Sequence, residues 1–252
     1  MLRIPLLRWL WLIAGVMLLG HVVTLYLYLE RGVSRDWGIP RHFDLNAEGN
    51  FASFFEASPL LISALVTLAL AAHYRAQQAP LAGRWAWLSG LLLFMAIDEL
   101  AQLHDLFTGP LRRRLDLDFG IFYFTWLLPA VLFLGFCAWY FAPLVRSLPG
   151  VIRVRLLVAA AVYFGGAVVV EMVSGFVAED GRRSTPYLMV ITFEEACEIC
   201  GVLLALGVLL QLLRSVQPRT TIEILGGTIG IAPSPPASAS ATAPGPKAEQ
   251  LP

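Results

Sequence analysis

The sequence has very few charged side chains and almost no lysine. Charged residues make up 14% of its 252 residues, and Lys247 is the single lysine. A soluble domain carries roughly 25% charged residues, so this chain lacks the polar surface that would keep one apolar core dissolved in water. Its net charge is zero, which gives no sign of a nucleic-acid-binding surface. A mean hydropathy of +0.70 indicates that lipid is the solvent.

Cysteines are scarce as well, and no signal-peptide cleavage site is apparent. The three cysteines are odd in number and lie in apolar stretches, which argues against a disulfide framework. Cys197 and Cys200 have the spacing of a Cys-x-x-Cys motif, but on a membrane helix they are typical of small packing residues. The first apolar run continues to about Leu29 without a small-residue cleavage site, which predicts a retained first helix.

Long apolar runs are what the sequence has in abundance. A bilayer core about 30 Å thick needs about 20 apolar residues per helix, and the linkers between the runs carry Arg, Pro or Gly, as helix ends do. We therefore expect an all-α fold, a polytopic transmembrane bundle of about six helices within residues 1–216. The expected spans are at about 9–29, 57–73, 85–106, 121–145, 155–177 and 187–213.

The end of the chain changes composition after Gln217. Residues 217–252 become rich in Pro, Ala and Ser, which predicts a disordered tail. Six spans would place both termini on one side of the membrane. With the termini inside, the inner segments hold one arginine more than the outer loops, so the positive-inside rule favours cytoplasmic termini. We expect an integral protein of a bacterial inner (plasma) membrane.

The main functional signal is a set of carboxylates within the expected spans. Each one costs roughly 2.5–3.5 kcal/mol at a helix centre, and no Lys or Arg lies in the middle of any span to pair with them. The charge must then be relieved by protons, a bound cation or a water-filled cavity. The six residues are Asp98, Glu99, Glu171, Glu194, Glu195 and Glu198.

These side chains share one expected depth. Counted from the end that faces loops 1, 3 and 5, all six lie about 6–11 residues deep, and His21 joins them at about 8. At 1.5 Å per residue this is a layer roughly 9–17 Å below one surface. His104 and Asp105 lie just above it, on the side of an acidic first loop. Four helices therefore bring ligand-type side chains to one layer.

Helical angles indicate which members can converge. Glu194 and Glu198 are about 40° apart around the helix axis, and Glu195 is within about 60° of Glu198. All three fit one arc, and Gly201 permits a close neighbour. On the third expected helix, Asp98, Gln102 and Asp105 share a face. Glu99 and His104 are about 140° apart, so both can serve one site only if the helix breaks.

The same segments resemble an uncharacterised bacterial family of six-helix integral membrane proteins. The resemblance rests on a D-E-x4-H-[DE] motif and an E-E-x2-E motif, together with the acidic first loop, and it covers most of residues 40–210. Here Asp105 replaces a second acidic Glu of the family pattern and Ile199 replaces Met. The family has no established activity, so the resemblance implies the fold and the residue set but not a reaction.

The leading hypothesis is a membrane-embedded metal site. Carboxylates with one or two imidazoles suit iron, manganese or zinc, and a carboxylate outside the ligand set would act as a general base. A membrane lipid or another apolar small molecule is the expected substrate, with oxidative and hydrolytic reactions both open. The candidate ligands are Asp98, Glu99, His104, Asp105, Glu171, Glu194, Glu195, Glu198 and His21.

Three alternatives stay open. The same carboxylates in a proton- or cation-coupled transporter or channel would be protonated and would exchange ions, although no inverted repeat is visible. A haem held by His21 and His104 would explain the histidines but not the acids. A non-catalytic assembly or sensor protein would use the polar layer only to fix the register of its helices.

Overall fold

All regular secondary structure in the described part of the chain up to Val216 is helical. The computed structural model describes residues 5–47, 49–117, 119–216, 222–224 and 227–229. Residues 1–216 form one unit and residues 217–252 another. The helices of the first unit are α1 (Leu6–Arg31), α2 (Gly38–Phe43), α3 (Phe51–Ala76), α4 (Ala82–Ala101), α5 (Asp105–Leu115), η1 (Gly120–Phe122), α6 (Leu127–Ser147), α7 (Gly150–Phe164), η2 (Gly165–Val170), α8 (Glu171–Ala178) and α9 (Thr185–Val216).

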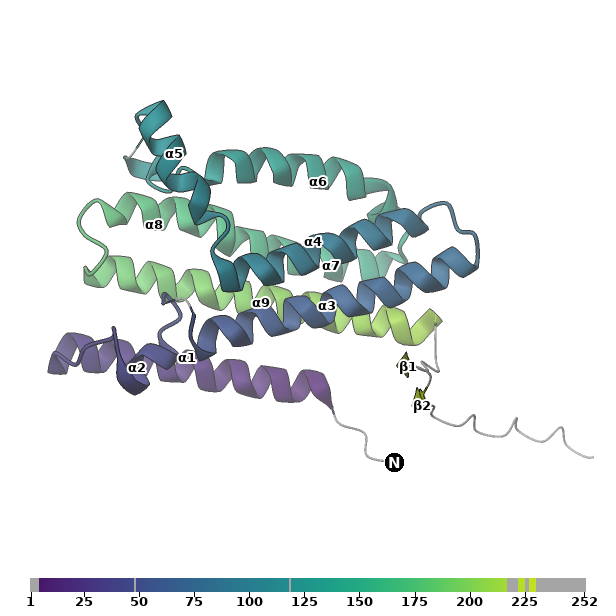
Figure 1. The fold of residues 1–252 in the computed structure, drawn as a ribbon, viewed down its shortest axis with the longest axis horizontal. Coiled ribbons are helices and arrows are strands. Elements are labelled where there is room, and N and C mark those ends of the chain that lie inside the picture. Colours follow the sequence, from purple (N-terminus) through teal and green to yellow (C-terminus); the bar gives the residue numbers. More distant parts are fainter. Residues whose placement is uncertain (1–4, 48, 118, 217–221, 225–226, 230–252) are drawn as a thin grey trace, which may run out of the picture. The chain divides into compact units, whose positions relative to one another are not determined.

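Five of the described helical segments are long and apolar enough to cross a membrane. The shortest of them, α6, has 21 residues and reaches about 30 Å, the thickness of a bilayer core. A sixth span is obtained if α4 and the following helix, which are bent by 83°, are counted together. Successive long helices run in alternating directions (Figure 1). The expected all-α bundle of about six membrane helices is confirmed, and the chain is an integral membrane protein by its apolar helices.

The bundle is apolar on the outside, as lipid requires. Leu132 and Trp139 of α6 are 77% and 72% exposed, whereas Ser63 and Thr67 of α3 are fully buried. A soluble protein of this size would have the opposite distribution. The placement of the polar side chains therefore agrees with the hydropathy of the sequence.

The third expected span, 85–106, is wrong at its end. Helix α4 stops at Ala101, and Gln102 adopts a left-handed conformation with φ of 54°. The carboxylate of Asp98 accepts the backbone N–H of His104 at 2.8 Å, which stabilises the turn away from the helix. Asp98, Gln102 and Asp105 therefore do not share a helical face. Asp105 begins α5, and its side chain lies outside the described ones.

The second expected span, 57–73, is longer than predicted. Helix α3 begins at Phe51 because Asn50 and Ser53 form a capping box, in which each side chain bonds the backbone of the other. The extra turns bring Glu56 into the helix. An acidic residue assigned to the first loop is thus part of a membrane span.

The fifth expected span, 155–177, contains a change of helix type. Helices α7 and α8 are joined without a break by η2, a π-helical segment that starts at Gly165 and Gly166. Such widened turns are common at functional sites because they change the direction of the side chains that follow. Glu171 is the first residue after the π-helical segment.

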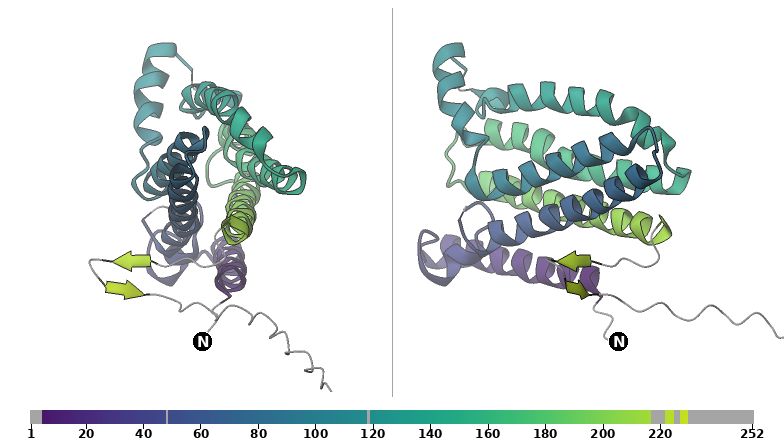
Figure 2. Two further views of the ribbon diagram at one scale, coloured as in Figure 1. Left: turned by 90° about the vertical axis from the view of Figure 1, so that its right-hand side faces the viewer. Right: turned by 45° about the vertical axis from the view of Figure 1, so that its right-hand side comes forward.

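Helix α9 is the centre of the bundle. It packs against α1, α3, α7, η2 and α8, and the left view of Figure 2, which looks down the helices, shows α9 between its neighbours. Its side chains Ile199, Leu203 and Leu206 are almost completely buried in the main core. Any polar side chain on this helix is therefore brought close to several other helices.

The second unit contains a short β-hairpin. Strands β1 (Ile222–Ile224) and β2 (Gly227–Ile229) pair antiparallel, with Ile222 opposite Ile229. Most of the tail that was expected to be disordered, residues 217–221, 225–226 and 230–252, lies outside the described residues. Disorder of the tail stays a prediction.

Candidate functional site

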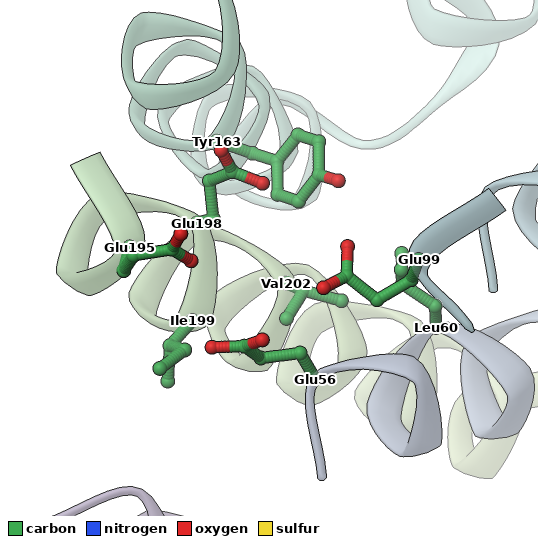
Figure 3. A pocket seen from close by; sticks show the side chains of 8 residues that line it. All are labelled: Glu56, Leu60, Glu99, Tyr163, Glu195, Glu198, Ile199 and Val202. Atoms are coloured by element: carbon green, nitrogen blue, oxygen red, sulfur yellow. The ribbon is translucent and has the colours of Figure 1, made fainter. Parts of the chain in front are cut away.

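Acidic side chains are half of the lining of a small cavity between α3, α4, α7 and α9. Its volume is about 10 Å³, and its lining residues are Glu56, Leu60, Glu99, Tyr163, Glu195, Glu198, Ile199 and Val202. The four glutamates come from three helices, and no Lys or Arg is among the described lining residues. In Figure 3 the carboxylates of Glu99 and Glu195 point toward each other across the cavity. We call Glu56, Glu99, Glu195, Glu198 and Tyr163 the carboxylate cavity.

Two pairs of side chains interact within the carboxylate cavity. Glu99 lies close enough to Glu56 to interact with it, and Glu198 interacts in the same way with Tyr163. A bond between two carboxyl groups needs a proton on one of them, since an ionised carboxylate can only accept. The phenol of Tyr163, in contrast, can donate to an ionised Glu198. The cavity thus contains one potential donor, and its carboxyl groups could bond one another only with an added proton.

Two glycines allow α7 and η2 to approach α9 at this point. A side chain at Gly201 would place its Cβ 2.6 Å from the Cα of Tyr163, and one at Gly166 would lie 2.9 Å from the Cβ of Cys197. Neither contact is sterically possible. The expectation that Gly201 permits a close neighbour is confirmed, and that neighbour is the backbone of Tyr163.

A second acidic pair lies beside the carboxylate cavity. Trp126 donates from Nε1 to Oε1 of Glu171 at 2.9 Å. Glu194 is 7% exposed and interacts electrostatically with Glu171. Its Oε2 atom is buried without a hydrogen-bond partner among the described residues. Glu198 interacts electrostatically with both Glu171 and Glu194. This interaction connects the acidic pair with the carboxylate cavity.

Asp98 and His104 form a pair at the break after α4. The Nδ1 atom of His104 lies 2.9 Å from Oδ2 of Asp98, and the imidazole ring contacts Trp126 with 4.7 Å between ring centroids. An ionised Asp98 fixes the proton of His104 on Nδ1. Neither residue lines the carboxylate cavity.

His21 lies in a separate hydrogen-bonded cluster. Its Nδ1 accepts the backbone N–H of Leu45 at 3.0 Å, so its Nε2 carries the proton and donates to Thr192 Oγ1 at 3.1 Å. Thr192 in turn donates to the carbonyl of Leu188. Both ring nitrogens of His21 thus bond protein groups, and the histidine joins α1, the first loop and α9.

Charged side chains of the first loop complete this cluster. Asp44 is buried, 3.6 Å from His21 Nδ1 and 3.3 Å from Arg35 Nη1. Burial raises the pKa of Asp44 above its ordinary value of 3.8, while Arg35 acts in the opposite direction. Asn50 Nδ2 donates to the carbonyls of Arg41, Asp44 and Ala47 at 2.6–2.8 Å. We call His21, Arg35, Asp44, Asn50, Ser53 and Thr192 the loop clamp.

The predicted layer is therefore divided into separate groups. Glu99, Glu195 and Glu198 line the cavity, Glu171 and Glu194 form the adjacent pair, and Asp98 and His104 bond each other. Sequence reasoning missed two lining residues, Glu56 and Tyr163. The capping sequence from Asn50 to Ser53 would have revealed that Glu56 is helical, whereas no local signal marks Tyr163.

The described side chains do not form a ready-made set of metal ligands. In residues 5–216, as far as they are described, no three His, Cys, Asp or Glu side chains are arranged to hold a metal ion. His21 and His104 also have different partners, Thr192 with Leu45 and Asp98 respectively. A metal at the carboxylate cavity would need at least one side chain to rotate.

A family model matches residues 8–212, which is most of the chain. Its description is a domain of unknown function, DUF8692. The chain belongs to this family. No curated protein and no solved structure matches the chain. The expectation of an uncharacterised family is confirmed, while its bacterial origin and its motifs stay predictions.

Proposed function

We propose that this DUF8692 protein binds cations inside the membrane at the carboxylate cavity. One observation supports the proposal above all: four glutamates from α3, α4 and α9 surround one cavity that no described Lys or Arg lines. Several uncompensated buried carboxylates would cost more than the roughly 5–15 kcal/mol by which proteins are stable. Positive charge must therefore accompany the glutamates into the membrane.

The side-chain arrangement favours protons as these cations. A proton on Glu56 or Glu99, which lie close enough to interact, would let the two carboxyl groups share a hydrogen bond, and a proton needs no coordination sphere. Glu198 interacts electrostatically with Glu99 on one side and with Glu171 and Glu194 on the other. Closely spaced carboxyls of this kind suit proton exchange in transporters and channels. The protein is then a proton-exchanging membrane protein.

A metal ion is the second candidate, supported by the size and chemistry of the cavity. A volume of about 10 Å³ holds about one water-sized particle, which is also the size of one ion. Its donors are carboxylate and phenol oxygens, and His104 is not among the lining residues. Oxygen donors favour manganese over zinc, with iron between them. This cavity is too small for a lipid, so no reaction on an apolar substrate is part of the proposal.

The membrane location is proposed together with the site. We propose a bacterial inner membrane with both termini in the cytoplasm and bilayer lipid as the surrounding partner. Reporter fusions at the N-terminus and at Gln217 should then report the same, cytoplasmic compartment. Opposite compartments would mean that one of the counted segments, the bent α4–α5 pair first, does not cross.

The experiment that tests the site combines elemental analysis with a flux assay. Proteoliposomes with an internal pH dye should dissipate a pH gradient faster than empty liposomes. Glu198→Gln should abolish this acceleration, because an amide cannot release a proton. Glu179→Gln is the control, since Glu179 is an exposed loop residue outside the cavity.

The outcomes separate the two candidates. Metal-free protein with flux that depends on Glu198 supports proton exchange. One or two equivalents of manganese, iron or zinc that are lost in Glu195→Gln and Glu198→Gln support the metal centre instead. Protein without metal, whose flux is absent or unaffected by Glu198→Gln, refutes the cation site.

A further inference from the structure

The outer face of the bundle carries an apolar groove between α1 and α2. Its volume is about 330 Å³, and its lining side chains are apolar apart from Thr24: Val16, Leu19, Gly20, Val23, Leu27, Ile39, Pro40 and Phe43. Helix α2 is fixed there because Phe43 packs on Gly20, where a Cβ would lie 2.7 Å from the ring Cγ. Thr24 also donates to the carbonyl of Pro40 at 3.4 Å.

The groove follows one stripe of α1. Val16, Gly20, Val23 and Leu27 are three or four residues apart, the spacing of neighbours on one helix face. From Val16 to Leu27 the stripe extends about 16 Å along the axis, which is half the thickness of a bilayer. A single extended hydrocarbon chain in one leaflet has this direction and extent.

The stripe ends in a pair of opposite charges. Glu30 and Arg31 follow Leu27 at three and four positions, so both are its neighbours on the helix surface. Both are exposed, and neither forms an ion pair or hydrogen bond with another residue of the described chain. Arg35, in contrast, pairs with Asp44. A head group at this end therefore meets one available cation and one available anion.

We propose that this groove binds one phospholipid whose head group carries both a phosphate and a primary ammonium. Its acyl chain lies along Val16–Leu27, with Ile39, Pro40 and Phe43 of α2 as the second wall. The phosphate pairs with Arg31 and the ammonium with Glu30. Charge complementarity excludes a purely anionic head group, which Glu30 would repel. The site is independent of the carboxylate cavity.

Two adjacent valines provide a matched test of the groove. Val22 and Val23 are both exposed, at 52% and 47%, but of the two Val23 alone lines the groove. The protein is reconstituted in nanodiscs with equal amounts of phosphatidylethanolamine, phosphatidylcholine and phosphatidylglycerol. Lipid that is retained after extraction into mild detergent is then counted by native mass spectrometry.

The proposal predicts one retained phosphatidylethanolamine per protein. Val23→Trp fills the groove and should lower retention by at least about tenfold, a loss of 1.4 kcal/mol, while Val22→Trp should leave it unchanged. Arg31→Gln and Glu30→Gln should each remove the preference for phosphatidylethanolamine, and Arg113→Gln should not. If Val23→Trp fails to fold, Leu19→Trp replaces it, because Leu19 also lines the groove, near Val16.

Equal retention by the Val22 and Val23 variants would overturn the groove site, because the lipid would then be held elsewhere. Equal retention of all three lipids by the unmodified protein would overturn the head-group assignment. Neither result affects the carboxylate cavity, whose test is cation flux and metal content.

Discussion

Two clusters of buried polar side chains, the carboxylate cavity and the loop clamp, differ in how their polar groups find partners. In the loop clamp, complementary groups meet: Asp44 forms an ion pair with Arg35, and His21 accepts from Leu45 and donates to Thr192. In the carboxylate cavity four acids face one another, and the described lining offers one phenol and no base.

The difference indicates which cluster is structural and which has a function. Buried polar groups that satisfy one another stabilise a fold without any ligand. Buried acids without a base lower stability until a cation arrives, and such sites are retained for what they bind. Substitutions should therefore destabilise the loop clamp strongly and the carboxylate cavity hardly at all.

The largest effect is expected for Asn50→Ala. This change removes three hydrogen bonds to loop carbonyls and the cap of α3. It should lower the free energy of unfolding by about 2–4 kcal/mol, which thermal melting in detergent would detect. Asn46→Ala is the matched control, with an expected change below about 0.5 kcal/mol. Equal effects of the two changes would show that the clamp is not a structural centre.

Gly201→Ala should cause the next largest loss of stability. The added methyl group would meet the backbone of Tyr163 and push α7 from α9, at a cost of about 1–3 kcal/mol. Gly135→Ala on α6 is the control, because a Cβ there has nothing within 4 Å and alanine favours a helix by up to about 1 kcal/mol. A harmless Gly201→Ala would contradict the close approach of the two helices.

The effect of pH on stability through Asp44 of the loop clamp should be smaller than the effects of these two substitutions. Burial raises the pKa of Asp44 above 3.8 in the folded state, so the folded protein binds more protons than the unfolded chain just above that pH. Stability should therefore fall as pH rises from 3.8 through the raised pKa. Asp44→Asn should flatten this part of the stability curve. A slope that is unchanged in this variant would assign the titration to another group.

The smallest change in stability is expected for Glu195→Gln. Glutamine mimics a protonated glutamate in size and polarity, so the melting temperature should stay the same or rise if Glu195 is protonated. Asn50→Ala in the loop clamp is the contrasting variant. A metal ligand would be indicated if Glu195→Gln clearly lowered the stability and if added manganese stabilised the unmodified protein but not this variant.

The fold was largely predictable because lipid imposes a simple rule on the sequence. Long apolar runs identify the helices, and their boundaries failed where short-range chemistry overrides hydropathy. At Gln102 the chain turns left-handed although the residue is not Gly or Asn, so the end of α4 had no sequence signal. At Asn50 the capping box was a sequence signal for the start of α3. The predicted span nevertheless began at residue 57, because it was placed by hydropathy alone.

The site was predictable in its chemistry but not in its partners. A common depth for Glu99, Glu195 and Glu198 follows from counting residues along helices, and the cavity contains all three. The spacing of residues along the helices does not predict the hydrogen bonds of His104 with Asp98 and of His21 with Thr192. Those choices depend on which helices are neighbours and on the broken end of α4, which are properties of the tertiary structure.

Infrared spectroscopy of the carboxyl groups tests the central claim most directly. The carbonyl stretch of a protonated carboxyl is separate from the band of an ionised carboxylate, so the two states can be read from one spectrum. Metal-free protein at neutral pH should show protonated carboxyls, and Glu99→Gln and Glu198→Gln should each reduce that band while Glu179→Gln leaves it unchanged. A spectrum of metal-free, folded protein with no protonated carboxyl at neutral pH would contradict proton binding at the carboxylate cavity.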